Sequence, residues 1–452
     1  MNWNKEQLKA LDLIKSGENV YIYGPGGTGK STIINYIKDS NTILLAPTGI
    51  AALNIGGVTI CSFSNLGKDS IWLQETSIET IISNEKLVKL INSSTKLIVD
   101  EISMVSLQVM EKLNNFFKTI KKNRLPYGGI QAIVLGDPFQ IPLIPYTPKN
   151  QILLSKKKAL LGETYNKEQI SSDYFEDSSL FDYTFRDNII ELKQNCRTEN
   201  QNFSEILSIL RIGHRNPKID DALNNINDRI YPKPENCIEI VHTNIDNNKI
   251  NKTKLDELRG EEKTFKNIEN RKEYLENTNI IENSPNSLDR INSIDILIKS
   301  FNKDNKALQE PLVLKLGCKI MLINNISPEL VNGMCGVVIE INDSIIQVKF
   351  DKHDHITDIH KHKFYTDDER LYITRFPLIL AYSFTAHKVQ GLTILSPIFI
   401  DPDKHKYTDG KTMYTILSRV TKIEHIFLKS KLFKYHFKPD IKRINWYESI
   451  KT

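Results

Sequence analysis

Residues 24–31 constrain the fold of this chain more than any other segment. They read GPGGTGKS and fit the pattern G-x-x-x-x-G-K-[ST]. A β-prone run precedes them at residues 20–23, and residues 31–38 have helical spacing. In this context the glycines let backbone N–H groups face phosphates, while Lys30 reaches the β- and γ-phosphates and Ser31 binds Mg²⁺. The segment therefore predicts a nucleotide site; the alternative is a glycine-rich turn before a helix.

Polar residues follow two further apolar strands. Asp100 and Glu101 come at the end of an apolar run that begins at Lys96. Behind a phosphate-binding loop, such a pair places Asp100 near the metal and Glu101 near an attacking water. Gln140 follows the apolar run 130–135, and we expect it to sense the γ-phosphate. A Gly-Asp-Pro turn is the alternative interpretation of that segment.

The order of elements predicts an α/β fold with parallel sheets. Near-continuous apolar strands separated by helices are typical of a parallel sheet covered on both faces. A helix over residues 203–211, ended by Gly213, begins a second α/β set, and Pro377 is expected in the first turn of a helix running toward His387. Residues 244–310 favour a linker or exposed helices. The strands expected in the two sets are 20–23, 42–46, 96–100, 130–135, 238–241, 319–323, 397–401 and 425–428.

Composition excludes several classes of protein. The 452 residues are enough for two to four domains, and hydrophobic and charged residues make up 40% and 25% of them. No apolar run approaches the length of a membrane span, and the first residues lack the apolar segment of a secretion signal. Five cysteines without C-x-x-C spacing disfavour a disulfide framework or a zinc site. A formal net charge of +5 is compatible with nucleic-acid binding but does not establish it.

Short segments with a family likeness follow one another along nearly the whole chain. They read NKEQ (4–7), APTGIAA (46–52), VTICSF (58–63), DEISMV (100–105), YGGIQ (127–131), GDPFQIP (136–142), LKQNCR (192–197), AHKVQGLT (386–393) and YTILSRV (414–420). In this order they resemble the adenine-reading Q motif, motif Ia and the DNA-contacting stretch after it, motif II, the approach to motif III and motif III itself, and motifs IV, V and VI. Residues 316–325 and 331–333 resemble a lead-in to an SH3-like insertion. The chain thus resembles superfamily 1B DNA helicases of the Pif/RecD-like branch, the petite-integration-frequency family with its Dda-like relatives.

The resemblance implies two RecA-like P-loop NTPase domains. Domain 1A would span residues 1–200, with an insertion at 64–92 as the candidate 1B pin. Domain 2A would span residues 201–452, with an SH3-like 2B insertion at about 333–375. Trp72 is the candidate pin residue because Ile71-Trp72-Leu73 is the only cluster of the insertion with a large aromatic side chain. Packing of Trp72 onto the first domain is the alternative.

The implied activity is that of an ATP-dependent DNA helicase that uses Mg²⁺, moves 5′ to 3′ on single strands and unwinds duplex DNA in replication, repair or recombination. Its partners would be single-stranded and forked DNA, without a membrane, and the active form would be monomeric. It would be intracellular: cytoplasmic or nucleoid in bacteria or phage, nuclear or in a viral factory otherwise. A RecD-like translocase subunit of a larger complex and a non-catalytic ATP-gated clamp are alternatives, but a clamp needs neither a general base nor arginine fingers.

The resemblance also assigns roles to individual residues. Gln7 would read adenine, although Asn4 and Gln7 also fit a helix capping box. Phe63 and Phe139 would stack on bases, with core packing as the alternative. Cys61 stands where the family usually has His. The catalytic set is Lys30, Glu101, Gln140, Arg197 and Arg419; the nucleotide set is Gln7, Gly24, Pro25, Gly26, Gly27, Thr28, Gly29, Lys30, Ser31, Thr32, Asp100 and Gly391; the metal ligands are Ser31 and Asp100; and the DNA set is Thr48, Ser62, Phe63, Trp72, Phe139, Thr385 and His387.

Overall fold

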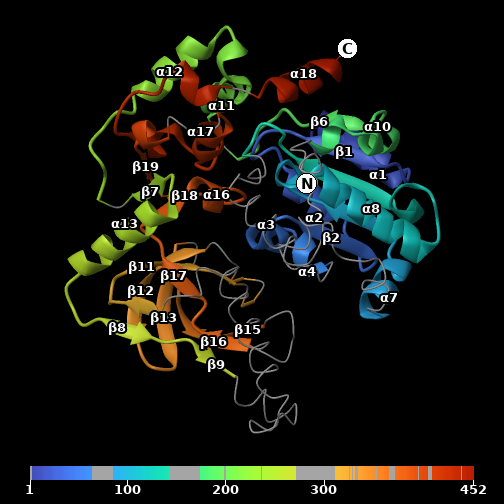
Figure 1. Ribbon diagram of the computed structural model, residues 1–452. Helices are drawn as coiled ribbons and strands as arrows, with labels where there is room; N and C mark the ends of the chain where they lie inside the picture. Colours follow the sequence, from blue (N-terminus) through green and yellow to red (C-terminus); the bar gives the residue numbers. More distant parts are fainter. Residues whose placement is uncertain are drawn as a thin grey trace, which may run out of the picture. The chain divides into compact units, whose positions relative to one another are not determined.

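The structure divides into two compact units. It is a computed structural model, and the first unit holds residues 1–232, 389–395 and 401–452, while the second holds 233–388 and 396–400 (Figure 1). This grouping differs from the expected division after residue 200, which stays a prediction. The residues described are 3–63, 85–141, 174–197, 200–235, 237–270, 311–324, 326–327, 329–330, 334–351, 354–365, 372–394, 396–405, 410–438 and 440–451.

A parallel sheet organises the first unit, as predicted. Its six strands have the order β3-β2-β4-β5-β1-β6, and every pair is parallel. β1 lies between β5 and β6 and is buried along its whole length, which explains its uninterrupted apolar sequence. The bounds are β1 Val20–Tyr23, β2 Thr42–Ala46, β3 Val58–Thr59, β4 Lys96–Val99, β5 Gln131–Gly136 and β6 Ile189–Glu191.

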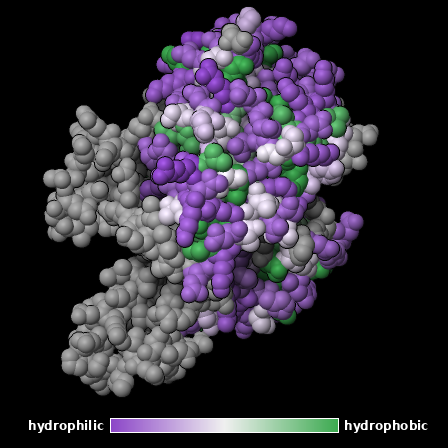
Figure 2. Space-filling model, turned by 90° about the vertical axis from the view of Figure 1, so that its right-hand side faces the viewer, coloured by the Kyte–Doolittle hydropathy of each residue, from purple (hydrophilic) through white to green (hydrophobic). Residues whose placement is uncertain are grey.

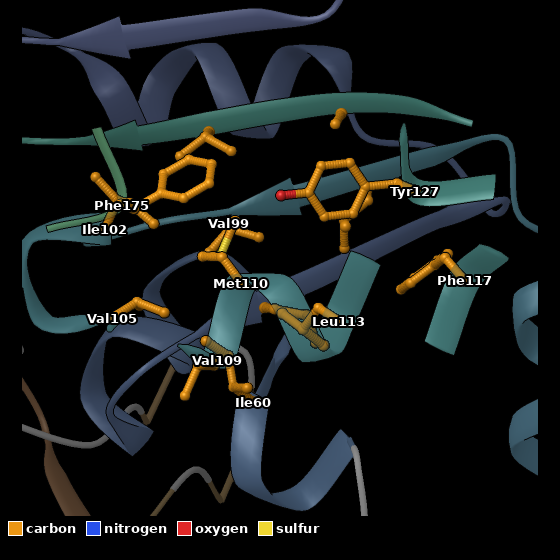
Figure 3. Packing of buried hydrophobic residues seen from close by; sticks show 14 of the residues in the cluster. Ile60, Val99, Ile102, Val105, Val109, Met110, Leu113, Phe117, Tyr127 and Phe175 are labelled. Carbon is orange, nitrogen blue, oxygen red and sulfur yellow. The ribbon is translucent and has the colours of Figure 1, made fainter. Parts of the chain in front are cut away.

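Helices cover this sheet on both faces because alternate strand residues point to opposite sides. Val20 and Ile22 belong to one apolar core, and Tyr21 and Tyr23 to the other. Figure 3 shows part of the second core, where Met110 of α8 and other side chains of that helix pack with strand residues. The helices of this part are α1 Lys5–Lys15, α2 Lys30–Ile37, α3 Gly49–Asn54, α4 Ile60–Phe63, α7 Glu85–Ser93, α8 Leu107–Lys121 and α10 Ser179–Phe185.

The C-terminal helix packs against the first strand of this sheet. Trp446 of α18 lies edge-on to Tyr21 and Tyr23, with ring centroids 5.9 and 5.5 Å apart. Arg443 of the same helix is almost fully buried and forms an ion pair with Glu176 at 2.9 Å. The remaining elements of the first unit are the expected helix α11 Gln201–Ile212, which ends at Gly213, then α12 Ile219–Asn227, α17 Gly410–Leu417, β20 Ile426–Leu428 and α18 Ile441–Ser449.

A second parallel arrangement begins the other unit. β7 (Ile238–Val241) pairs in parallel with β18 (Ser383–Thr385) and β19 (Ile398–Ile400). The segment after β7, expected as a linker or exposed helices, begins with helix α13 (Asn244–Glu257). That helix is packed rather than fully exposed, because the buried side chain of Asn251 hydrogen-bonds to backbone atoms of Tyr382 and Ser383.

An antiparallel β region fills much of the second unit. β12 and β13 fall within the segment expected as an SH3-like insertion and belong to a sheet of order β14-β13-β12-β11-β17. The same unit holds α16 (Ala386–Val389) up to Lys388. The strands are β8 Lys263–Phe265, β9 Ile268–Glu269, β10 Leu312–Leu314, β11 Lys319–Leu322, β12 Cys335–Ile341, β13 Ile345–Phe350, β14 Ile356–His360, β15 His362–Tyr365, β16 Tyr372–Arg375 and β17 Leu378–Leu380.

Two expectations about this region are wrong. β11 was expected in the second α/β set, but it pairs antiparallel with β12 and β17. Pro377 was expected to begin a helix, yet strand β17 follows it, and its carbonyl accepts a hydrogen bond from Ile323 N at 2.9 Å. Both errors have the same cause: a short apolar run is compatible with a helix or with either kind of sheet until its partner strand is known.

The surface gives one further constraint. In the described part of the chain, no helix is both long and apolar enough to cross a bilayer. Figure 2 shows hydrophobic residues as separate patches among hydrophilic ones on the face in view. Scattered apolar residues of this kind are normal on a protein surface.

Candidate nucleotide-binding site

The phosphate-binding loop curls around one lysine. Gly27 and Gly29 have φ angles of +89° and +86°, which glycine adopts without strain. Lys30 Nζ donates hydrogen bonds to the carbonyl oxygens of Gly24 and Pro25 at 2.7 and 2.9 Å. The first N–H groups of a helix have no acceptor within the helix and favour an anion. The start of α2 therefore has the geometry that the sequence pattern predicted.

The neighbouring threonines and serine of the loop differ in exposure. Thr28 is fully buried and donates from Oγ1 to the Pro25 carbonyl at 2.9 Å, so it shapes the loop from inside. Ser31 and Thr32 are exposed at the first turn of α2. Their hydroxyl groups are accessible to a ligand on this side of the loop.

Residues 192–197 lie directly on the phosphate-binding loop. Asn195 Nδ2 donates to the Gly26 carbonyl at 3.3 Å, and Cys196 N donates to the Gly27 carbonyl at 2.7 Å. A methyl group added at Gly27 would lie 2.6 Å from Asn195 Oδ1. The contact is therefore close enough to require glycine in the loop for a second, steric reason.

Three predicted catalytic side chains meet at one glycine. A methyl group placed on Gly26 would lie 2.9 Å from Arg419 Nη2, 3.4 Å from Arg197 Nη1 and 3.7 Å from Gln140 Nε2. These side chains come from the segment after α17, from the segment after β6 and from the segment after β5. The structure thus gathers residues far apart in the sequence around the center of the phosphate-binding loop.

The two arginines form a concentrated positive charge. Arg197 Nη1 donates to the Ser418 carbonyl at 3.0 Å, and Arg419 Nε donates to the Thr415 carbonyl at 3.0 Å. Among the described residues neither guanidinium forms an ion pair with a carboxylate. Burial, followed by the charge of Arg419, lowers the pKa of Arg197 to about 10, and burial lowers the pKa of Arg419. An anion between them would relieve both penalties.

The acidic pair, Asp100 and Glu101, contributes the negative charge of the site. Asp100 is buried, and burial together with the charge of Glu101 raises its pKa to about 7. Glu101 has φ +51°, and its Oε2 is buried without a hydrogen-bond partner among the described residues. Burial lowers the pKa of Lys30, although the charges of Asp137, Glu101 and Asp100 oppose the shift. A cation near Asp100 would favour its ionised form.

These groups fit a Mg²⁺-bound nucleotide. In the described ranges, no three His, Cys, Asp or Glu side chains are grouped to hold a metal by themselves. Mg²⁺ commonly takes only one or two protein oxygens and completes its shell with phosphate oxygens and water. Ser31 and Asp100 supply such oxygens, and Gly26 leaves room that a side chain would fill. The proposed metal ligands nevertheless stay a prediction.

Gln7 was expected either to read adenine or to form a helix capping box with Asn4. The capping box is confirmed, since Gln7 N donates to Asn4 Oδ1 at 2.8 Å and Asn4 N donates to Gln7 Oε1 at 3.1 Å. Gln7 Nε2 also donates to the Thr28 carbonyl at 3.1 Å. The cap therefore fastens α1 to the phosphate-binding loop, and contact with adenine stays a prediction.

Of the DNA contacts expected in the first unit, Thr48 lies at a helix start, whereas the two phenylalanines are buried. Thr48 Oγ1 accepts a hydrogen bond from Ala51 N at the start of α3. Phe63 is buried and stacks on Phe117, with ring centroids 6.2 Å apart. Phe139 is also buried, under the guanidinium of Arg211 at 4.6 Å. The arrangement favours the core-packing alternative for both phenylalanines, because a base cannot stack on a covered ring.

The other members of the expected site lie in the second unit, elsewhere in the first unit, or outside the described residues. Thr385 is buried at the end of β18, and His387 is half-buried in α16, both in the second unit. Gly391 belongs to the first unit, has φ +81° and accepts a hydrogen bond from Asn54 at 3.2 Å. The Ser62 side chain and all of Trp72 lie outside the described residues.

One important residue was not singled out from the sequence. Asp137 is fully buried and accepts hydrogen bonds from Arg211 Nε at 3.0 Å, Tyr414 Oη at 2.9 Å and Gln140 Nε2 at 3.3 Å. It follows β5 as Asp100 follows β4. That shared position at a strand end was the available signal, but the Gly-Asp-Pro turn offered a simpler explanation.

The fold and the site together define a P-loop nucleoside triphosphatase. A family model described as PIF1-like helicase matches residues 2–221, and one described as DNA helicase Pif1, 2B domain matches residues 300–341. The two matches cover more than half of the chain. The chain belongs to the PIF1-like helicase family, and it is an ATP-dependent DNA helicase.

Individual relatives agree with this assignment. The chain is 27% identical to the ATP-dependent DNA helicase Pif1 of Bdellovibrio bacteriovorus, over 86% of this chain and 80% of that protein. It is 26% identical to uncharacterized protein 030L of Invertebrate iridescent virus 6, over 99% and 94% of the two chains. It is also 26% identical to PIF1 of Danio rerio, of which it spans 60%.

Solved structures show the same fold. The crystal structure of Pif1 helicase from Candida albicans matches with a TM-score of 0.74 at 24% identity, covering all of both chains. Bacteroides Pif1 in complex with ADP-AlF3 and ssDNA matches with a TM-score of 0.69 at 25% identity, covering 100% of this chain and 98% of that one. These likenesses confirm the predicted RecA-like architecture.

Proposed function

We propose that this helicase uses Mg²⁺ and ATP to move 5′ to 3′ along single-stranded DNA and to unwind forked duplexes in replication, repair or recombination. The observation that carries the proposal is the meeting of Arg197, Arg419 and Gln140 at Gly26. A buried arginine, Arg419, and a half-buried one, Arg197, without carboxylate partners in the described part suit the spreading negative charge of phosphoryl transfer.

Each residue then has a defined task. Lys30 exchanges its bonds to the loop carbonyls for bonds to phosphate oxygens. Asp100 and Ser31 would hold Mg²⁺, which would supply positive charge next to the phosphates of the nucleotide. Glu101 accepts a proton from the attacking water, and its unpartnered Oε2 is suited to that task. Arg197 and Arg419 stabilise the charge that develops on the transferred group.

Coupling to movement follows from where the arginines originate. Arg419 follows α17 and Arg197 follows β6, whereas Lys30 begins α2. Hydrolysis therefore depends on segments that a conformational change can separate, and DNA bound along the protein can promote their approach. A Pif1 relative is described in complex with ADP-AlF3 and ssDNA, which supports DNA as the ligand that accompanies the nucleotide.

The proposed setting and assembly are an intracellular, reducing compartment and a monomer. Cys196, Cys237, Cys318 and Cys335, the cysteines whose side chains are described, form no disulfide. That state supports a reducing compartment. One neighbouring structure is described as showing two coordinating Pif1 helicases at forked dsDNA, so unwinding by this chain needs measurement across protein concentrations.

The test is strand displacement on two forks that differ only in the polarity of the single-stranded tail. We expect the chain to displace the strand when a 5′ tail is available for loading and to fail when only a 3′ tail is available. Lys30→Ala is the negative control for ATP-driven displacement. Equal displacement from the 3′ tail would contradict the polarity, and DNA-stimulated hydrolysis without displacement would favour a translocase that does not unwind alone.

A further inference from the structure

Asp137 is the center of a buried hydrogen-bond network. Its Oδ1 accepts from Arg211 Nε at 3.0 Å and from Phe139 N at 3.1 Å, and its Oδ2 accepts from Tyr414 Oη at 2.9 Å and Gln140 Nε2 at 3.3 Å. The residue has no exposed surface. Both oxygens are thus used by donors from its own loop, from α11 and from α17.

The carboxyl group is ionised. Burial alone would raise the pKa of Asp137, but the charges of Arg211 and Lys30 and the hydrogen bonds outweigh it and hold the pKa below its usual value. An ionised carboxylate has no proton to donate and can only accept. The group of Gln140 that faces it must therefore be the NH₂, which leaves the Gln140 oxygen directed elsewhere.

The remaining oxygen of Gln140 lacks a partner. Gln140 is nearly fully buried, and its Oε1 has no hydrogen-bond partner among the described residues. The same amide lies beside Gly26 at the phosphate-binding loop. A buried acceptor is costly until it meets a donor. Phosphate oxygens are acceptors at neutral pH, so they cannot satisfy it, whereas a water molecule can.

We propose that Asp137 is a positioning residue that fixes the Gln140 amide, so that Gln140 Oε1 accepts a hydrogen bond from the attacking water. This inference rests on the proposed hydrolysis and refines the expected contact of Gln140 with the γ-phosphate. The water oxygen forms a bond to the γ-phosphorus while its proton passes to Glu101. The bond from the γ-phosphorus to the β–γ bridging oxygen breaks, and its electron pair leaves with ADP.

The network also links this orientation to the arginine side of the site. Tyr414 lies on α17, the helix that precedes Arg419, and Arg211 lies on α11. Arg211 Nη1 is 3.6 Å from Glu191 Oε1, which accepts from Tyr447 Oη at 2.9 Å. If α11 and α17 move away, Asp137 loses its outside partners, so the water is positioned only when the arginines are in place.

The test is a charge exchange between Asp137 and Gln140. Asp137→Asn offers an NH₂ group that turns the Gln140 amide around, and Gln140→Glu places two carboxylates together. Each single change should lower kcat at least about 10-fold and leave KM for ATP within about 3-fold. The double variant, with Asn donating to Glu, should recover most of the lost kcat, because the free acceptor for water is restored.

A matched control and a second variant keep the outcome decisive. Gln131→Glu changes the same residue type at the start of β5, whereas Gln140 lies beyond the end of that strand, and it should leave kcat unchanged. Thermal melting identifies loss of fold; if Asp137→Asn melts early, Tyr414→Phe, which removes one hydrogen bond from Asp137 and no charge, should show the same fall in kcat without a rise in KM. If the kcat of the Tyr414→Phe variant equals that of the unaltered protein, the proposal is overturned.

Other results separate this inference from the proposed function. Additive losses in the double variant, or a parallel loss of ATP affinity relative to ADP, overturn the positioning role because they indicate contact with the γ-phosphate. The unaltered protein is assayed with single-stranded DNA in the same series. If it does not hydrolyse ATP, the proposed function fails; if it does and the exchange shows no recovery, only the inference fails.

Discussion

The two sides of the nucleotide site are built in different ways. On one side, a single strand–loop–helix segment supplies Lys30 and the glycines, and backbone geometry does most of the work. On the other side, Arg197, Gln140 and Arg419 come from three separate segments and meet only in the folded chain. The comparison teaches that binding phosphate requires local structure, whereas hydrolysing the nucleotide requires side chains from distant segments to meet.

On the side of the site built by the loop, removing Lys30 should cause the largest loss of ATP hydrolysis. Lys30→Ala deletes the ammonium around which the loop curls and should reduce DNA-stimulated ATP hydrolysis to background, measured by phosphate release. Lys38→Ala is the matched control, because Lys38 closes the same helix and its Nζ donates to the Ile55 carbonyl. Normal hydrolysis by Lys30→Ala would refute the site assignment.

A change on the arginine side should affect turnover rather than binding. Arg419→Lys retains the charge but loses the planar fork, and kcat should fall about 1,000-fold while nucleotide affinity changes little. Arg229→Lys is the control, since Arg229 donates to the Glu424 carbonyl away from the loop. An equal loss of nucleotide affinity would erase the distinction between the two sides of the site.

The general base should give a somewhat smaller effect. Glu101→Gln keeps the shape of the side chain but cannot take a proton from water, so hydrolysis should slow about 100-fold. ATP and DNA binding, measured by fluorescence titration, should persist because Asp100 still holds the metal. Loss of nucleotide binding would instead make Glu101 a metal ligand or a structural residue.

The smallest catalytic effect is expected at Phe63. Its ring stacks on Phe117 in the core, so Phe63→Ala should destabilise the fold by about 3 kcal/mol and lower the melting temperature. Affinity for single-stranded DNA should stay within about 3-fold at a temperature where the variant is folded, because no base–ring stack is lost. A large loss of DNA affinity with unchanged melting would restore the stacking interpretation.

The success of sequence analysis followed the same division between local and distant structure. The loop at residues 24–31 and the strand-end position of Asp100 depend on neighbours in the chain, and both were predicted. The meeting of the two arginines at Gly26 was expected only through a family resemblance. The partnership of Asp137 with Arg211 and Tyr414 was missed, because side chains so far apart leave no periodic or spacing signal that joins them.

The errors were of the same kind. β11 and the residues after Pro377 are short apolar runs, and only their antiparallel partners determine that they are strands of one sheet. By contrast, the expectation of exposed helices after residue 244 fits α13, most of whose side chains are exposed, although Asn251 anchors the helix by hydrogen bonds. In the two errors, tertiary contacts outweighed local composition.

The packing of α18 on β1 has a consequence for how the chain matures on the ribosome. Tyr447 and Glu191, which join through a hydrogen bond, are 256 positions apart, and Trp446 covers rings of the strand that leads into the phosphate-binding loop. Synthesis proceeds from the N-terminus, so the first sheet emerges long before the helix that completes its core. Until α18 is translated, those aromatic rings lack the cover of Trp446, and nascent chains stalled before residue 441 should bind general chaperones more strongly than chains that include α18.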